Sequence, residues 1–448
     1  MRSTTILELA DFASSCSVDS APEPVRACVE KMLIDSLGVA LAGQGTDEYQ
    51  KLEEVWSSAP GASTLWGKSQ SVDTAAATML NAVALCVLEL DEGNKFARGH
   101  PAAHVLPVAL AEAERIGAGG HALQDAILAG YEVAARVARA FHSVDGLHPH
   151  GNWGAIGAAA AVGRLNGFST QELAEAMDAA AGLMLASPFA SALQGTFVRN
   201  TWLGSAGVNA LTAVRIAESG LGTIDATGTA TLGRILGSID ADEIVQDLGR
   251  RWEITGGYFK RHSSCNYTHP PADAALEARM DARFEAQDVE RITVQTHALA
   301  VPLSSTDPQT RLAAMFSIPH VVAVALTHGR CHPEAFAVDA LHDPAVVRLR
   351  ERTAVELDGA IDARRPAKRG ARVCIGLSSG ESIVAEVPDA IGDAGHHPLS
   401  PVQIDDKLRS LIGAGRLAAV HEAVRALQAD APVSTAMKHL GNTSEINE

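Results

Sequence analysis

The stretch DTAAATMLNAVALCVLEL, residues 73–90, decides the fold class. It is almost uniformly apolar, which is typical of a buried helix. Hydrophobic residues make up 47% of the chain and aromatic residues only 4%, while alanine is plentiful. This composition favours packed helices over a large sheet, so the sequence predicts a mainly α protein.

Helical patterns continue on both sides of this stretch. Ser169 and Glu172 form a capping-box pattern that opens one of the helices. The expected helices cover residues 24–42, 104–117, 121–142, 154–166, a segment starting after Ser169, and 202–218. Up to about residue 260, the chain is therefore predicted to be helical with glycine-rich connections.

The pattern changes near residue 265. Residues 290–298 alternate like a strand, and residues 371–377 and 381–387 flank Ser-Ser-Gly and read as a hairpin. Helices are expected at 308–328 and 343–353, and again from residue 401. The predicted architecture is a large all-helical domain, residues 1–265 completed by 398–448, with a smaller α+β domain, residues 266–397. Two domains also fit the length of 448 residues.

Composition excludes several classes of function. A net charge of −17 argues against a nucleic-acid partner, because binding a phosphate backbone needs basic patches. No apolar run is long enough for a membrane span, and the N-terminus lacks the apolar core of a signal peptide. The six cysteines form no CxxC pair. A reduced, cytoplasmic protein is expected.

Four polar stretches interrupt the apolar sequence. They are ELDEGNKFARGHPAAHVLP at 89–107, GLHPHGNWG at 146–154, GTFVRNTWLG at 195–204 and YFKRHSSCNYTHPPADA at 258–274. The last lies at the predicted domain boundary, where binding sites often form.

The residue types in these stretches allow several chemistries. Asp91 and His100 would form a proton-transfer pair at a helix junction, although solvated carboxylates and packed histidines are the simpler alternative. Arg199, between apolar residues, needs an anionic partner. Cys265 has basic neighbours that favour a thiolate, but a buried cysteine is usually inert. The spacing of His100 with His104, and of His148 with His150, lacks a third metal ligand, so no metal is expected.

Taken in order, six pieces of the chain resemble the MmgE/PrpD family of 2-methylcitrate dehydratases, cis-aconitate decarboxylases and iminodisuccinate epimerases. They are MLIDSLGVALAG (32–43), GHPAAHVLPVALAEAE (99–114), HPHGNWGAIGAAAA (148–161), GTFVRNTWLGSAGVNA (195–210), FKRHSSCNYTHPPADA (259–274) and MFSIPHVVAVAL (315–326). The resemblance implies a homodimer whose active site lies between the domains and needs no metal or organic cofactor.

The chain departs from the dehydratase and decarboxylase members at several positions. Their DFDDT-like segment is replaced by ELDEGN. Arg199 replaces a lysine, Cys265 a histidine and His320 a tyrosine. Because arginine is a poor proton donor, these changes favour a reaction that needs only two acid–base groups.

The sequence therefore predicts an epimerase that abstracts a proton next to a carboxylate, acting on iminodisuccinate. His148 and Lys260 would be the opposed acid–base pair, and Asp91 and His100 would hold or tune one of them. The expected contacts to a di- or tricarboxylate are Lys95, Arg98, His150, Arg199, Cys265, His269 and His320. Two alternatives stay open: a 2-methylcitrate-type dehydratase or related decarboxylase, and a non-catalytic binder of an acidic metabolite.

Overall fold

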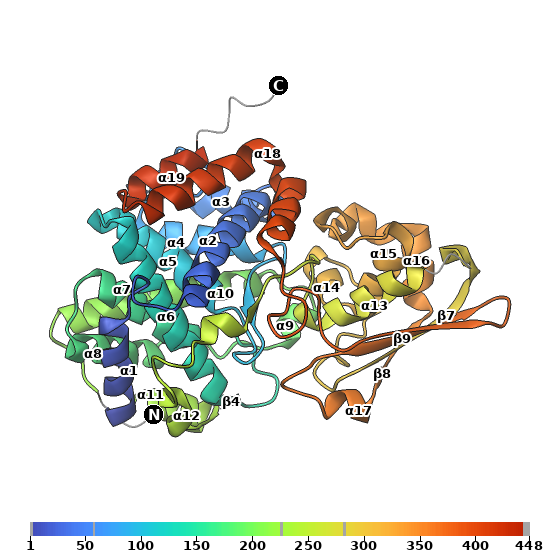
Figure 1. The fold of residues 1–448 in the computed structure, drawn as a ribbon, viewed down its shortest axis with the longest axis horizontal. Helices are drawn as coiled ribbons and strands as arrows, with labels where there is room; N and C mark the ends of the chain where they lie inside the picture. Colours follow the sequence, from blue (N-terminus) through green and yellow to red (C-terminus); the bar gives the residue numbers. More distant parts are fainter. Residues whose placement is uncertain (1–2, 57–58, 225–226, 281–283, 442–448) are drawn as a thin grey trace.

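The computed structural model describes residues 3–56, 59–224, 227–280 and 284–441. Helices dominate the first half of the chain, and a small sheet with its own helices lies to one side of them (Figure 1). The helices of the first half are α1 (Ser3–Ser15), α2 (Glu23–Gly43), α3 (Asp47–Trp56), α4 (Thr74–Cys86), α5 (Pro101–Ile116), α6 (Gly120–Ala140), α7 (Gly154–Leu165), α8 (Thr170–Gly182), α9 (Ala190–Leu193) and α10 (Val198–Glu218), and the short helices α11 (Thr227–Ala230) and α12 (Ala241–Val245) follow them. The prediction of a mainly α protein with a smaller sheet-containing region is confirmed.

The second half mixes helices with strands. Its elements are α13 (His269–Arg279), β7 (Val289–Thr296), α14 (Arg311–Met315), α15 (Ile318–His328), α16 (Pro344–Glu351), β8 (Thr353–Leu357), α17 (Gly359–Asp362), β9 (Ala371–Leu377), β10 (Ser382–Val387), α18 (Pro401–Gln428) and α19 (Val433–Gly441). Single turns of 3-10 or π helix occur at Thr231–Ile235, Glu253–Gly256, Asn266–Thr268, Ala286–Asp288, Pro333–Phe336 and Val338–His342. The predicted strand at 290–298 and the predicted hairpin correspond to β7, β9 and β10.

The sheet has the strand order β10-β9-β7-β8. β9 pairs antiparallel with β10 and with β7, whereas β8 pairs parallel with β7. The alternation of β10 is regular, with every second side chain buried. Three two-stranded pairs complete the strands: β1 (Pro60–Thr64) with β2 (Ser71–Val72), β3 (Gly93–Asn94) with β6 (Gly257–Tyr258), and β4 (Phe141–Ser143) with β5 (Gly237–Ile239).

Buried apolar side chains gather in two large clusters. One draws on residues 6–254 and on 399–440, so α18 and α19 pack on the first-half helices. The other draws on residues 272–387 together with Ala192. The structure shows that the C-terminal helices pack on the helices of the first half. The predicted domain boundaries stay a prediction.

Small residues let α6 and α7 approach closely, as the GAIGAAAAVGRLN segment predicts. A Cβ added to Gly157 would lie 2.3 Å from the backbone oxygen of Gly130. At the start of α7, a Cβ on Gly154 would lie 2.2 Å from the ring of His104. The polar loop that precedes α7 is thereby held against the start of α5.

The helix predicted over 73–90 is shorter than expected. Asp73 caps its start by accepting hydrogen bonds from the backbone of Ala75 and Ala76. α4 ends at Cys86, and Glu89 adopts a left-handed backbone conformation with φ of 51°. This turn stops the helix and sends the chain toward β3. The pairing of β3 with β6 then brings the first polar stretch beside the fourth.

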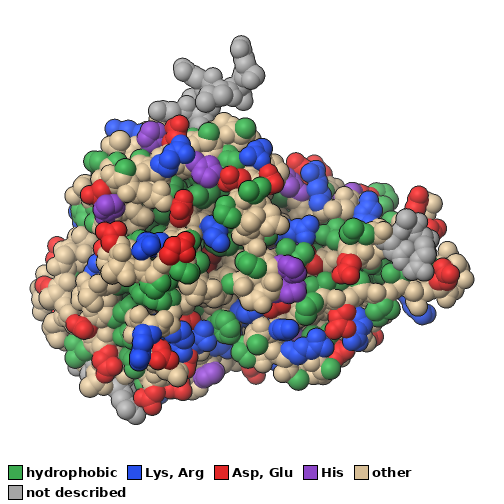
Figure 2. All heavy atoms as spheres, in the orientation of Figure 1, with side chains coloured by type: hydrophobic (Ala, Val, Ile, Leu, Met, Phe, Trp, Pro, Cys, Tyr) green, Lys and Arg blue, Asp and Glu red, His purple; other side chains and the backbone are tan. Residues whose placement is uncertain are grey.

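The helix predicted over 308–328 is also divided. It forms as α14 and α15, and Ser317 caps the second by accepting from the backbone of His320. In the described ranges, no helix is both long and apolar enough to span a membrane. Figure 2 shows acidic and basic side chains interspersed over one face of the molecule, so charges of one sign do not dominate that face.

Candidate active site

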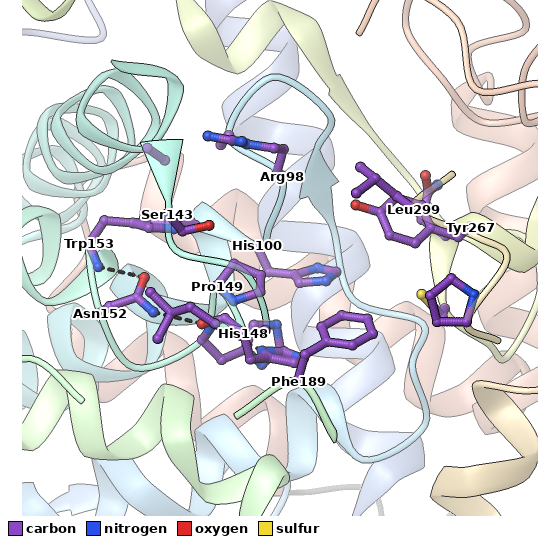
Figure 3. Close-up of a pocket in the computed structure, with 18 of the residues that line it drawn as sticks. Arg98, His100, Ser143, His148, Pro149, Asn152, Trp153, Phe189, Tyr267 and Leu299 are labelled. Carbon is purple, nitrogen blue, oxygen red and sulfur yellow. Dashed lines mark hydrogen bonds between the residues drawn. The ribbon is translucent and has the colours of Figure 1, made fainter. Parts of the chain in front are cut away.

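All four polar stretches converge on one pocket of about 420 Å³ (Figure 3). Arg98 and His100 come from the first stretch, His148 and His150 from the second, and Arg199 from the third. The fourth stretch and the sheet-containing part complete the wall with Tyr258, Cys265, Tyr267, Leu299, Phe316 and Arg369. A pocket between two packed parts of a chain is a common place for a small-molecule site.

His100 is the residue before the first turn of α5, where Pro101 fixes the helix start. Its Nδ1 lies 2.6 Å from the backbone oxygen of Glu92 and 3.0 Å from Oδ2 of Asp91. With two acceptors at Nδ1, the proton resides there, and Nε2 is left for the pocket. A carboxylate that fixes one ring nitrogen in this way prepares the other for proton transfer.

Asp91 lies behind His100 and does not line the pocket. Its carboxylate is fully buried, and Oδ1 lies 3.0 Å from Nζ of Lys260. Burial alone would raise the pKa of Asp91, but His100, Lys260 and Arg199 hold it well below its usual range. Asp91 is therefore ionised, and its carboxylate faces Nδ1 of His100.

Lys260 is buried between two carboxylates, Asp91 and Glu89, each 3.0 Å from its amine. Burial would lower the pKa of Lys260, but these two anions raise it above the ordinary value. Lys260 is absent from the pocket wall. Its geometry does not favour the expected role as a base, and its charge instead holds the acidic residues in place.

Glu89 completes a buried network of four charges. It pairs with Arg199 on one side and with Lys260 on the other. Its left-handed φ of 51° is uncommon for a residue with a side chain, and such conformations concentrate at functional sites. Arg199 thus has the anionic partner that its apolar neighbours predict. Burial would lower the pKa of Arg199, but Glu89 raises it.

His148 is a neutral hydrogen-bond donor in this geometry. Its Nδ1 accepts a hydrogen bond of 3.1 Å from the backbone of His150, so the proton of the neutral ring lies on Nε2. Burial, together with Arg199, holds the pKa of His148 well below its ordinary value. The ring stacks on Phe189 with a centroid distance of 5.4 Å. These contacts favour binding of an anionic oxygen over proton abstraction.

Three other polar groups of the wall, those of His150, Tyr258 and Cys265, are uncharged as well. Burial and Arg199 keep the pKa of His150 well below its ordinary value, and its ring lies edge-on to His100 at 5.0 Å. Burial raises the pKa of Tyr258 well above the usual value. It also raises the pKa of Cys265 to about 11, so a protonated thiol replaces the reactive thiolate considered above.

Three expected substrate contacts lie outside the pocket wall. Lys95 turns toward the sheet-containing part, where its amine pairs with Asp389 at 2.9 Å and Asp393 at 2.7 Å. His269 approaches the backbone oxygen of Ser264 at 3.3 Å, and His320 that of Ala335 at 3.2 Å. Each of these side chains has a structural partner, so a role in substrate binding is not supported for them.

Several pocket residues were not predicted from the sequence. Glu89 lies at the end of an apolar run. This position could have predicted a site residue, because an acid buried there needs a cationic partner. Tyr258 and Tyr267 lie in the fourth polar stretch, although neither was singled out there, whereas Arg369 carries no local signal. Among the described residues, no group of three or more His, Cys, Asp or Glu side chains is arranged to hold a metal ion.

Comparison with known proteins places this pocket in context. The MmgE/PrpD N-terminal domain matches residues 7–235, and the MmgE/PrpD C-terminal domain matches residues 262–430. The chain belongs to the MmgE/PrpD family. The resemblance seen in the six sequence pieces is therefore confirmed at the level of the family, and members of this family are enzymes of the dehydratase and decarboxylase type.

Two curated relatives refine this assignment. The chain is 24% identical to the cis-aconitate decarboxylase-like protein oryM of Aspergillus oryzae, over 95% of both chains. It is 26% identical to the cis-aconitate decarboxylase of Mus musculus, over 73% of this chain and 70% of the relative. Neither relative is an epimerase, so the comparisons favour the lyase alternative over the predicted epimerase.

Proposed function

We propose that the protein is a lyase that decarboxylates an unsaturated tricarboxylate of the cis-aconitate type by delivering one proton to carbon. The observation that carries the proposal is the pairing of His100 with Asp91. The ring of His100 lines the pocket, and its Nδ1 lies 2.6 Å from the backbone oxygen of Glu92 and 3.0 Å from the buried carboxylate of Asp91. The names of the two relatives support the same reaction class.

The number of acid–base groups separates the candidate reactions. An epimerase needs two, one on each face of the carbon. The expected partner groups do not meet this need, because Lys260 is held in ion pairs behind the pocket and His148 has its proton on Nε2. Decarboxylation of an allylic carboxylate needs a single proton donor, which matches His100.

The proposed step balances as follows. The bond between the CH2 group and its carboxylate breaks, and its electron pair forms a new C=C bond. The step requires a His100 ring that is protonated on both nitrogens. The electrons of the old C=C bond take the proton from Nε2 of this ring at the carbon next to a second carboxylate. Carbon dioxide leaves, and solvent returns a proton to the ring. Asp91 stabilises the protonated ring before transfer.

The wall supplies donors for the negative charge that develops. His148 presents a neutral N–H and Tyr258 a protonated phenol, so both donate to carboxylate oxygens. Preorganised donors of this kind stabilise a carbanion-like state without reorganisation. Phe189 and Phe316 form an apolar part of the wall, which favours loss of a charged carboxylate as neutral carbon dioxide.

Dehydration of a 2-methylcitrate-type substrate is the second candidate. It is favoured by Tyr258, whose ring centroid lies 6.4 Å from that of His100. A protonated phenol beside a histidine base provides the acid that a leaving hydroxyl requires. For the predicted epimerisation of iminodisuccinate, the assigned pair was His148 and Lys260, and in the described part of the chain these two groups are not placed as opposed bases.

A panel of three substrates tests the proposal. The purified protein is incubated with cis-aconitate, 2-methylcitrate and iminodisuccinate, and released carbon dioxide and unsaturated products are measured. Carbon dioxide from cis-aconitate alone supports the decarboxylase. An unsaturated product from 2-methylcitrate without carbon dioxide would replace it with the dehydratase, and binding without turnover would replace it with a non-catalytic role.

A further inference from the structure

Two arginines from separate parts of the fold share the pocket wall. Arg98 belongs to the loop after β3 and Arg369 to the segment that precedes β9. The backbone oxygen of Lys95 links them, because it accepts from the guanidinium of Arg369 and, at 3.3 Å, from the backbone N–H of Arg98. Lys95 itself is anchored to Asp389 and Asp393. The arginines are thus held in fixed positions across the junction.

Neither arginine has a carboxylate partner in the described ranges. Four arginines there are buried, and three of them pair with an acid: Arg136 with Glu132, Arg199 with Glu89 and Arg350 with Asp307. Arg369 is the exception, at 4% exposure. Its guanidinium contacts the ring of Tyr267 with a centroid distance of 5.3 Å. A buried guanidinium normally requires an anion, so one is expected to come from the pocket.

Arg98 is strained and partly desolvated in the same place. Its backbone adopts a left-handed φ of 54°, and its guanidinium donates to the backbone oxygen of Phe141. Burial, reinforced by the nearby charge of Arg369, lowers the pKa of Arg98. Two like charges near each other repel unless an anion lies between them. In Figure 3, Arg98 and His148 lie on opposite sides of His100.

We infer that Arg98 and Arg369 form a clamp for the central carboxylate of the substrate, which is carried neither by the protonated carbon nor by the CH2 group that loses carbon dioxide, and that this clamp selects tricarboxylates over dicarboxylates. The inference rests on the proposed function only in assuming that the ligand is a carboxylate of this kind. Two guanidinium groups offer paired N–H donors that match the oxygens of one carboxylate.

Binding of unreactive ligands tests the clamp without requiring turnover. Tricarballylate is a saturated tricarboxylate, and glutarate is a dicarboxylate that lacks the third group. Calorimetry with the full chain is expected to show tricarballylate binding at least about tenfold tighter than glutarate. In Arg98→Met and in Arg369→Met, this ratio should fall to about one through loss of tricarballylate affinity. The exposed Arg364, which pairs with Glu386, provides the control variant Arg364→Met with an unchanged ratio.

Two further variants protect the test against misfolding. Arg98→Lys and Arg369→Lys keep the charge but lose the paired donors, and they should retain the wild-type Tm while lowering the ratio severalfold. The clamp is wrong if the variants keep the wild-type ratio, if both ligands weaken equally, or if the wild-type protein does not distinguish them. Tricarballylate selectivity without decarboxylation of cis-aconitate would uphold the clamp and reject the proposed reaction. Decarboxylation of cis-aconitate with an unchanged KM in both Met variants would uphold the proposed reaction and reject the clamp.

Discussion

Nδ1 of His100 lies 3.0 Å from Oδ2 of the buried Asp91. Together with the hydrogen bond from Nδ1 to the backbone oxygen of Glu92, this contact fixes the proton on Nδ1 and directs Nε2 to the pocket. Because the pairing rests on one histidine and one carboxylate, each can be tested separately.

His100→Gln should lower kcat for carbon dioxide release by about 10²–10⁴-fold, the usual range for a lost acid–base group. Asp91→Asn should lower it by a similar factor, because the amide no longer supports a proton on the ring. Steady-state kinetics with cis-aconitate measures both effects. The exposed His142 gives the control His142→Gln, whose kcat should equal that of the wild type. A fully active His100→Gln variant would remove the assigned proton donor.

His148 is expected to act as a donor and not as a base. His148→Gln keeps an N–H group and should lose less activity than His148→Phe, by about tenfold or more. The pH dependence of kcat in His148→Gln should keep the wild-type shape, because the neutral ring does not titrate near neutral pH. If kcat of that variant no longer fell on the acidic side of the pH profile, His148 would instead be identified as the base.

Lys260 holds two buried anions, so its main effect is on stability. Lys260→Met leaves Glu89 and Asp91 short of one cation and should lower the free energy of unfolding by about 3–5 kcal/mol. The double variant Lys260→Met with Glu89→Gln should recover part of this loss, because it again leaves equal numbers of buried anions and cations, Asp91 and Arg199. Urea unfolding of the wild type, the two single variants and the double variant measures this double-mutant cycle.

The exposed pair of Arg215 and Glu218 is the control for Lys260. Arg215→Met should cost less than about 1 kcal/mol, as surface pairs usually do. Unchanged stability in Lys260→Met, with activity abolished, would indicate that Lys260 contacts the substrate directly.

Glu92 predicts a pH dependence of stability. Burial raises its pKa from 4.5 to about 8, although Tyr131 donates to it at 2.6 Å. Since the folded protein binds this proton more tightly than the unfolded chain, the contribution is full below about pH 4.5 and is lost as pH rises toward 8. Glu92→Gln should flatten the fall of unfolding free energy between pH 5 and 8, relative to wild type.

An exposed glutamate of β7 gives the comparison for this effect. Glu290→Gln should leave the pH slope of the wild type unchanged. Chemical unfolding at several pH values measures all three proteins. An identical slope in Glu92→Gln would mean that Glu92 is ionised in the folded protein at neutral pH.

The sequence predicts much of this fold because its patterns are local. The apolar run at 73–90 and the alternation at 371–387 each identify an element from neighbouring residues. The end of α4 was missed because it depends on Glu89, whose left-handed turn is stabilised by the distant Arg199 and Lys260. The strand β8 was missed because its parallel pairing with β7 is non-local.

The same reasoning explains the candidate site. Polar residues that interrupt apolar sequence predicted His100, His148 and Arg199, since burying them requires partners. Their individual roles could not be predicted, because the proton position on His148 depends on a backbone contact from His150. Arg369 lies in an irregular segment without a distinctive pattern, and only the folded chain brings it near Arg98.

Proton NMR of the purified protein with cis-aconitate in deuterium oxide tests the central claim most directly. Decarboxylation by one proton donor predicts two new signals from a terminal CH2= group, loss of the original vinyl signal, and a single deuterium on the neighbouring saturated carbon. Unchanged cis-aconitate, together with solvent deuterium entering iminodisuccinate without release of carbon dioxide, would contradict it and restore the epimerase.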